Sequence, residues 1–167
     1  GSYDMGIAPD LLTGFQSLSD GTVASKFGKE WGVNLNAKAG KAPNELMGKL
    51  KALVTVDHDE TIIRNVNEVS KMDFVAYIGS YQNNCMNYAH VVLPIATYVE
   101  TDGTFTNTER RVQLAKKKIE PAKNILAGWQ LLSKIAEKAG AKWSYGSAAD
   151  VMKEIAKLTP SYAEISH

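Results

Sequence analysis

Three polar side chains that could bind a ligand, Asp57, His58 and Asp59, follow an apolar run at residues 51–56. Carboxylate oxygens accept hydrogen bonds, so this cluster could bind a ligand that presents paired N–H donors. The same residues at the start of a helix could simply face water. They are poor candidates for a metal site, because no second set of ligands follows at a suitable spacing. The sequence therefore predicts no metal ligands here and leaves two interpretations, ligand contact and a solvated turn.

A second candidate is the polar segment at residues 100–113, which contains Asp102-Gly103 and two adjacent arginines. Its hydroxyl, amide and guanidinium groups are suited to charge-assisted, bidentate recognition of phosphate. These donors come from Thr106, Asn107, Thr108, Arg110 and Arg111. An alternative is a structural loop in which Glu109 and one arginine pair with neighbouring domains. We expect Asp102-Gly103 to form the turn of this segment.

Catalytic groups are not expected in this chain. The sequence shows no Ser–His–Asp set, phosphate-binding glycine loop or paired catalytic carboxylates. The single cysteine, Cys85, has no neighbour that would lower its thiol pKa, and His90 at a strand start is typical of a structural histidine. The lysines at residues 116–118 indicate a solvated face.

Three short apolar runs would position the candidate residues. They lie at residues 51–56, 73–78 and 90–93, separated by connections of helical length. This order predicts an α/β fold, a Rossmann-like parallel sheet with flanking helices and both faces covered. Ligands of such sheets bind at the carboxyl ends of the strands. The cluster at Asp57 and the residues after Ile78, including Ser80, would then share one rim.

The flanking regions divide the chain into three parts. Residues 1–50 should form an irregular loop plus short helices, one of them at 23–31. Residues 51–113 should form the α/β sheet region with the polar segment. Residues 114–167 should form a helical extension, with a buried stripe at Trp129 and Leu132 and a helix capped by Ser147. Together we expect one partial domain.

Composition excludes several classes of protein. The 167 residues are 44% hydrophobic and 22% charged, with a formal net charge of +1. This balance does not favour nucleic acid as a partner. No apolar stretch reaches the roughly 20 residues that span a bilayer, so we expect no direct membrane insertion and a cytoplasmic location. One cysteine excludes an iron–sulfur cluster held by this chain alone.

Several segments together resemble the molybdopterin oxidoreductase family, and in particular formate dehydrogenase catalytic (alpha) subunits. The longest similar segments read HVVLP at 90–94 and ETDGTFTNTERRVQ at 100–113. The segment YDMGIAP at 3–9, followed by GFQ at 14–16, is similar to another stretch of the family. The resemblance covers nearly the whole chain and corresponds to the C-terminal part of the molybdopterin-binding α/β region.

This resemblance implies that the chain is part of a larger, multidomain large subunit. The cofactor would be a molybdopterin guanine dinucleotide carrying molybdenum or tungsten. Iron–sulfur cysteines and the metal ligand would lie in regions that are missing here, so the chain should be inactive alone. The implied partners are the remainder of the large subunit and the iron–sulfur and NADH-oxidising subunits of an electron-transfer oxidoreductase. The implied cofactor-binding residues are Asp57, His58, Asp59, Ser80, Thr106, Asn107, Arg110 and Arg111.

Two segments depart from the family pattern. Asp57-His58-Asp59 replaces a Gly-Glu-Asn-Pro-like turn, where an acidic residue can accept hydrogen bonds from guanine. The stretch GSYQNNC at 79–85 replaces a D-x-F-x-T-E-T-A crossover. A second hypothesis follows, a cofactor-free structural and electron-transfer scaffold similar to the large iron–sulfur subunit of NADH:quinone oxidoreductase. A third hypothesis is a domain without independent activity.

Overall fold

The computed structural model describes residues 1–58 and 60–166 and divides them into two compact units. Unit 1 comprises residues 1–40, 98–120 and 129–167, and unit 2 comprises residues 41–97 and 121–128. The three-part division at residues 50 and 113 stays a prediction. Within the described residues, no helix combines the length and the apolar character that a membrane crossing requires.

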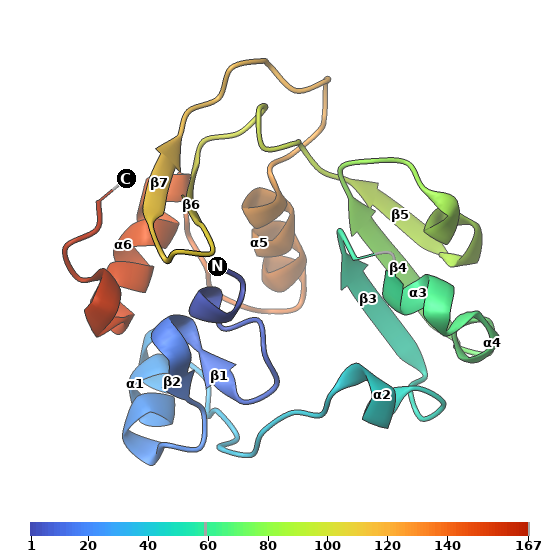
Figure 1. Ribbon diagram of the computed structural model, residues 1–167, viewed down its shortest axis with the longest axis horizontal. Coiled ribbons are helices and arrows are strands. Elements are labelled where there is room, and N and C mark those ends of the chain that lie inside the picture. Colours follow the sequence, from blue (N-terminus) through green and yellow to red (C-terminus); the bar gives the residue numbers. More distant parts are fainter. Residues whose placement is uncertain (59, 167) are drawn as a thin grey trace. The chain divides into compact units, whose positions relative to one another are not determined.

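Unit 2 is built on a three-stranded parallel sheet, shown in green at the right of Figure 1. Its strands are β3 (Ala52–Val56), β4 (Phe74–Gly79) and β5 (Val91–Pro94), and β4 lies in the middle. The register pairs Val56 with Ile78 and Gly79 with Pro94, so the carboxyl ends of the strands lie level. These strands confirm the predicted parallel sheet and α/β fold.

Short helices precede and connect the strands of unit 2. They are α2 (Pro43–Leu46), α3 (Glu60–Arg64), α4 (Val66–Val69) and the 3₁₀ helix η3 (Asn84–Tyr88). The predicted connection of helical length after β3 is divided at Asn65, whose φ of −126° and ψ of 33° are not helical. The second connection contains only the 3₁₀ turn, in which the Asn83 side chain accepts a hydrogen bond from the Cys85 N–H.

The core of unit 2 lies on one face of this sheet. It comprises Ile62, Val69, Met72, Val75, Tyr77 and Cys85. The opposite face of β3 is open, since Val54 is 57% exposed and Val56 is 43% exposed. The expectation of a sheet covered on both faces is therefore wrong at β3, although Ala76 and Ile78 on the same face of β4 are buried.

Gly79 and Tyr77 lie close together at the end of β4. A Cβ atom on Gly79 would lie 2.4 Å from the Tyr77 ring. The Tyr77 hydroxyl accepts a hydrogen bond from the Asn83 side chain at 2.6 Å, and the ring is almost fully buried. Glycine is thus required where the strand meets the rim.

Among the described residues, unit 1 combines three α-helices with two small antiparallel ribbons. The N-terminal part contains η1 (Tyr3–Met5), β1 (Leu11–Leu12), η2 (Thr13–Phe15), β2 (Gln16–Ser17) and α1 (Gly21–Trp31). Asp20 caps the start of α1 with its carboxylate, which accepts from the Thr22 and Val23 N–H groups, and Gly32 caps its end with a φ of 67°. The predicted helix at residues 23–31 is confirmed, whereas the expected irregular stretch before it contains these short elements.

The C-terminal part of unit 1 contains α5 (Gly128–Lys138), α6 (Ala148–Leu158) and η4 (Pro160–Tyr162). Ser147 caps α6 by accepting from the Asp150 N–H, as predicted. Glu154 of α6 accepts from the Trp31 indole at 2.8 Å and from the Tyr145 hydroxyl at 2.7 Å. Burial and this carboxylate raise the pKa of Tyr145. The α5 stripe is not core, since Leu132 is 42% exposed and no described segment buries it.

Candidate functional site

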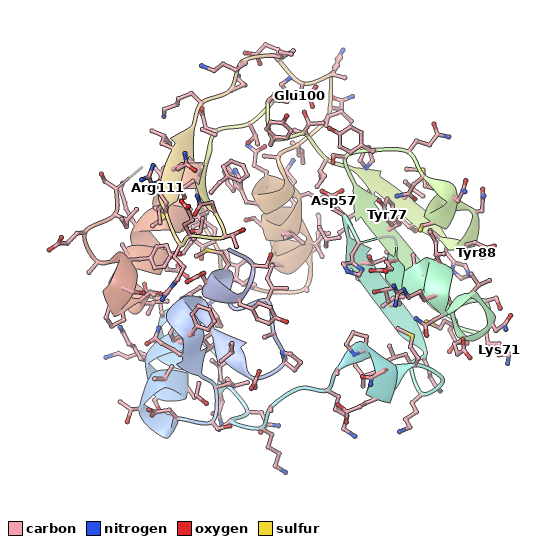
Figure 2. The ribbon with its side chains drawn as sticks, viewed as in Figure 1. Asp57, Lys71, Tyr77, Tyr88, Glu100 and Arg111 are labelled. Carbon is pink, nitrogen blue, oxygen red and sulfur yellow. The ribbon has the colours of Figure 1, made fainter. Side chains whose placement is uncertain are left out.

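The carboxyl-terminal rim of the sheet in unit 2 brings Asp57 and Ser80 together, as the sequence predicts. Figure 2 shows Asp57 at the end of β3. Its Oδ1 accepts from the Ser80 backbone N–H at 2.9 Å, and the Ser80 hydroxyl lies 3.3 Å from Oδ1 and 3.4 Å from Oδ2. This contact joins two adjacent strands across the rim, so the parallel topology itself creates it.

The backbone of Asp57 has an unusual conformation. Its φ of 47° lies in the left-handed region, which glycine adopts without cost and most other residues do not. The Asp57 N–H continues the sheet ladder by donating to the Ile78 carbonyl at 2.8 Å. The rim carboxylate is therefore held by its backbone on one side and by Ser80 on the other.

His58 makes hydrogen bonds to residues close to it in the sequence. Its Nδ1 lies 2.9 Å from the Thr61 hydroxyl, and its carbonyl accepts from the Thr55 hydroxyl at 2.7 Å. The His58 side chain is exposed. The third member of the cluster, Asp59, lies outside the described residues. Among the described residues, no group of three or more His, Cys, Asp or Glu side chains could hold a metal ion.

The second set of candidate residues lies in unit 1, on a hairpin of β6 (Gly103–Thr106) and β7 (Val112–Ala115). The turn is at residues 107–111, so the expectation of a turn at Asp102-Gly103 is wrong. Asn107 makes three hydrogen bonds within this turn. Its N–H donates to the Arg111 carbonyl, and its carbonyl accepts from the Arg110 N–H. Its side-chain Oδ1 accepts from the Arg111 N–H. Asn107 acts here as a turn residue, which its side chain suits.

Several long-range contacts hold this hairpin, and one of them joins the Thr104 hydroxyl to the Met152 sulfur of α6 at 3.3 Å. Thr106 pairs with the hydroxyl of Tyr162 from η4 at 2.9 Å, and Tyr162 is only 4% exposed. Arg110 donates from Nε to the Asp4 carboxylate at 2.8 Å, and its guanidinium lies 5.1 Å from the centre of the Phe15 ring. A pocket of about 360 Å³ opens beside this pair, lined by Asp4, Arg110, Val112, Ser161, Tyr162 and Ile165.

The two arginines differ in their surroundings. The Arg111 side chain is exposed, and within the described residues its guanidinium has no hydrogen bond or ion pair. Figure 2 shows Arg111 at the hairpin of unit 1. Arg110 instead contacts Asp4, whose carboxylate is almost fully buried. The predicted residues thus fall into a rim group (Asp57, His58, Ser80) in unit 2 and a hairpin group (Thr106, Asn107, Arg110, Arg111) in unit 1.

Comparison with known proteins assigns these groups to a family. The sequence matches the family described as molybdopterin oxidoreductase across residues 17–138. The chain belongs to the molybdopterin oxidoreductase family. This match contains the rim group and the hairpin group, and it confirms the resemblance seen in the sequence.

Proteins of Staphylococcus aureus (strain USA300) and Staphylococcus haemolyticus (strain JCSC1435), both with the provisional name formate dehydrogenase, are 38% and 37% identical to the chain. Each alignment covers 100% of this chain and 18% of the relative, so the chain spans under a fifth of the relatives' length. The acetylene hydratase from Pelobacter acetylenicus matches in fold, with a TM-score of 0.62 and 14% sequence identity. That match covers 98% of this chain and 24% of the hydratase.

Membership of the molybdopterin oxidoreductase family implies a molybdopterin cofactor with molybdenum or tungsten. The residues present fit the organic part of such a group. The Asp57 carboxylate is exposed and uses Oδ1 mainly for Ser80, which leaves acceptor capacity at Oδ2. In unit 1, taken by itself, Arg111 presents a guanidinium without a partner among the described residues, which suits a phosphate.

Sequence reasoning missed Asp4, Phe15 and Tyr162 as partners of the hairpin. Asp4 lies in a segment that carried the family resemblance, yet nothing local connects it with Arg110, 106 positions away. The available signal was chemical, since an acidic residue in an otherwise weakly polar segment must find a cation if it is buried.

Proposed function

We propose that this chain forms part of the cofactor-binding α/β region in the large subunit of a formate dehydrogenase-like molybdopterin oxidoreductase. The observation that carries the proposal is the rim carboxylate of Asp57, exposed and fixed by Ser80 within a chain 38% identical to proteins provisionally named formate dehydrogenase. The cofactor would be the guanine dinucleotide form. A carboxylate suits guanine, which presents a ring N–H and an amino group on one edge.

The protein's own residues would bind and orient this cofactor. In the proposal, Asp57 of unit 2 accepts from the guanine edge while Ser80 keeps the carboxylate in place. In unit 1, taken by itself, the hairpin group carries positive charge that suits a phosphate. When bound, the metal–pterin group supplies two-electron redox chemistry, which the side chains of this chain cannot perform. Residues beyond this chain would supply the metal ligand and the iron–sulfur centres.

The partners in the proposal are the remainder of the large subunit together with iron–sulfur and NADH-oxidising subunits. The location would be cytoplasmic. Formate is the proposed substrate, because the provisional names of the relatives give formate dehydrogenase.

A second candidate function is a scaffold without pterin, similar to the large iron–sulfur subunit of NADH:quinone oxidoreductase. One observation favours it, namely that Thr106, Asn107 and Arg110 already have partners within the chain. A scaffold needs its polar groups satisfied in this way, whereas a binding site keeps some of them available.

The experiment is to purify the full-length subunit and measure molybdenum, tungsten and pterin fluorescence after oxidation. Acid hydrolysis followed by chromatography should release guanine nucleotide in equal amount to pterin if the dinucleotide form is present. An Asp57→Asn variant should lower all these contents together, while Asp10→Asn, an exposed carboxylate in unit 1, serves as the control. Full-length protein that contains neither metal nor pterin would favour the scaffold.

A further inference from the structure

The hairpin turn carries two adjacent arginines with opposite environments. Arg110 has its Nε on the Asp4 carboxylate at 2.8 Å and its guanidinium beside the Phe15 ring. Asp4 is only 2% exposed, so this carboxylate depends on a cation for its charge to be tolerated. The Arg110 guanidinium is therefore held in an ion pair with Asp4.

The backbone conformation of Arg110 is also consistent with restraint by its side-chain contacts. Its φ of 63° is in the left-handed region, which a non-glycine residue adopts only when surrounding contacts hold it. The Asp4 and Phe15 contacts are such restraints. We call the three side chains Asp4, Phe15 and Arg110 the arginine clasp.

Arg111 is fixed at its backbone and open at its side chain. Its N–H donates to Asn107 Oδ1 at 2.9 Å, and its carbonyl accepts from the Asn107 N–H at 3.0 Å. The guanidinium is exposed. A fixed backbone with an open guanidinium lowers the entropy that is lost when an anion binds.

We propose that Arg110 is a positioning residue, and that the arginine clasp fixes the turn from which Arg111 binds a phosphate of the pterin dinucleotide. This inference rests on the proposed function, and it assigns different roles to two arginines that were both predicted to bind the cofactor. Arg110 would act through the turn, and Arg111 would contact the anion.

The test uses the full-length subunit with the variants Arg111→Gln, Arg110→Gln and Asp4→Asn. Arg111→Gln should lower molybdenum or tungsten and guanine nucleotide content about tenfold under limiting cofactor supply, because a charge-assisted bond is lost. The melting temperature of its cofactor-free form should be unchanged. Arg111→Lys should recover only part of the content, since lysine cannot bind phosphate bidentately.

Arg110→Gln and Asp4→Asn should both lower the melting temperature of the cofactor-free protein. The double variant should melt no lower than the worse single variant, as expected for two members of one contact. If the decreases in melting temperature were additive in the double variant, Asp4 and Arg110 would not form one contact. The positioning role would also be overturned if Arg110→Gln lowered cofactor content with no change in the melting temperature.

The two proposals fail in distinguishable ways. If Asp57→Asn lowers cofactor content and Arg111→Gln does not, the assignment of Arg111 is wrong while the proposed function stands. If wild-type protein contains no pterin nucleotide, the proposed function fails and the assignment of Arg111 fails with it. The melting data would still decide whether Asp4 and Arg110 form one contact.

Discussion

The rim of unit 2 and the hairpin of unit 1 hold their polar residues by different means. At the rim, Asp57 and Ser80 meet because they end neighbouring parallel strands, and the His58 side chain contacts Thr61, three positions away. At the hairpin, Thr106 and Arg110 depend on side chains 56 and 106 positions away. The order of the parallel strands brings the rim residues together, whereas individual side-chain pairs hold the hairpin residues in place. Loss of one side chain should therefore disturb the hairpin more than the rim.

The largest effect is expected from Asp4→Ala in the arginine clasp. It leaves the Arg110 guanidinium without its carboxylate and opens a buried site, so we expect a loss of about 2–3 kcal/mol in the free energy of unfolding. This value lies below that of a fully buried ion pair because the Arg110 side chain is 56% exposed. Urea denaturation measures it, with Asp10→Ala as an exposed control. Equal losses in both variants would contradict the difference between the regions.

A smaller effect is expected from Tyr162→Phe at the other hairpin contact. Removal of the hydroxyl leaves Thr106 without its partner beside a buried ring, which should cost about 1–2 kcal/mol. The matched control is Tyr98→Phe, since Tyr98 is 65% exposed. The double variant Thr106→Val with Tyr162→Phe should lose little more free energy of unfolding than Tyr162→Phe alone, because no buried polar group is then left without its partner. A further loss of similar size would show that the two groups are not coupled.

At the rim, Asp57→Ala and Asp57→Gly separate the side chain from the backbone. Both variants lose the Ser80 contacts, but glycine accepts the φ of 47° without strain. We expect Asp57→Gly to be more stable than Asp57→Ala by about 1 kcal/mol, as measured by thermal unfolding. If alanine proved equal to glycine, the left-handed backbone would not be a source of strain at the rim.

The smallest effect is expected from Thr61→Ala, which removes the hydroxyl that contacts His58. Because this contact is local and exposed, the change should stay within about 0.5 kcal/mol. Urea denaturation provides the measurement. A loss above about 1 kcal/mol would mean that the rim also depends on single side chains.

The sequence predicted the features that local patterns determine. Apolar runs located β3, β4 and β5, the pattern at residues 23–31 located most of α1, and the predicted cap at Ser147 agrees with α6. Since parallel strands end together, the contact between Asp57 and Ser80 also followed from the order of elements.

The hairpin could not be predicted in the same way. Asp102-Gly103 is a strong turn signal, yet the turn lies at residues 107–111, with Arg110 rather than glycine at the left-handed position. Its stability comes from Asp4 and Tyr162, which are distant in sequence. The exposure of Leu132 was missed for a related reason, because an amphipathic pattern shows that a helix has an apolar face but not which segment covers it.

The close approach of Gly79 to the Tyr77 ring has an evolutionary consequence. A side chain at position 79 would occupy space that the ring already fills, so neither residue can change size independently. Relatives with a larger residue at position 79 are expected to have a smaller one at position 77, and the hydrogen bond from Asn83 would then be lost as well. Substitutions at positions 77, 79 and 83, at the end of the central strand, should therefore be correlated across the family.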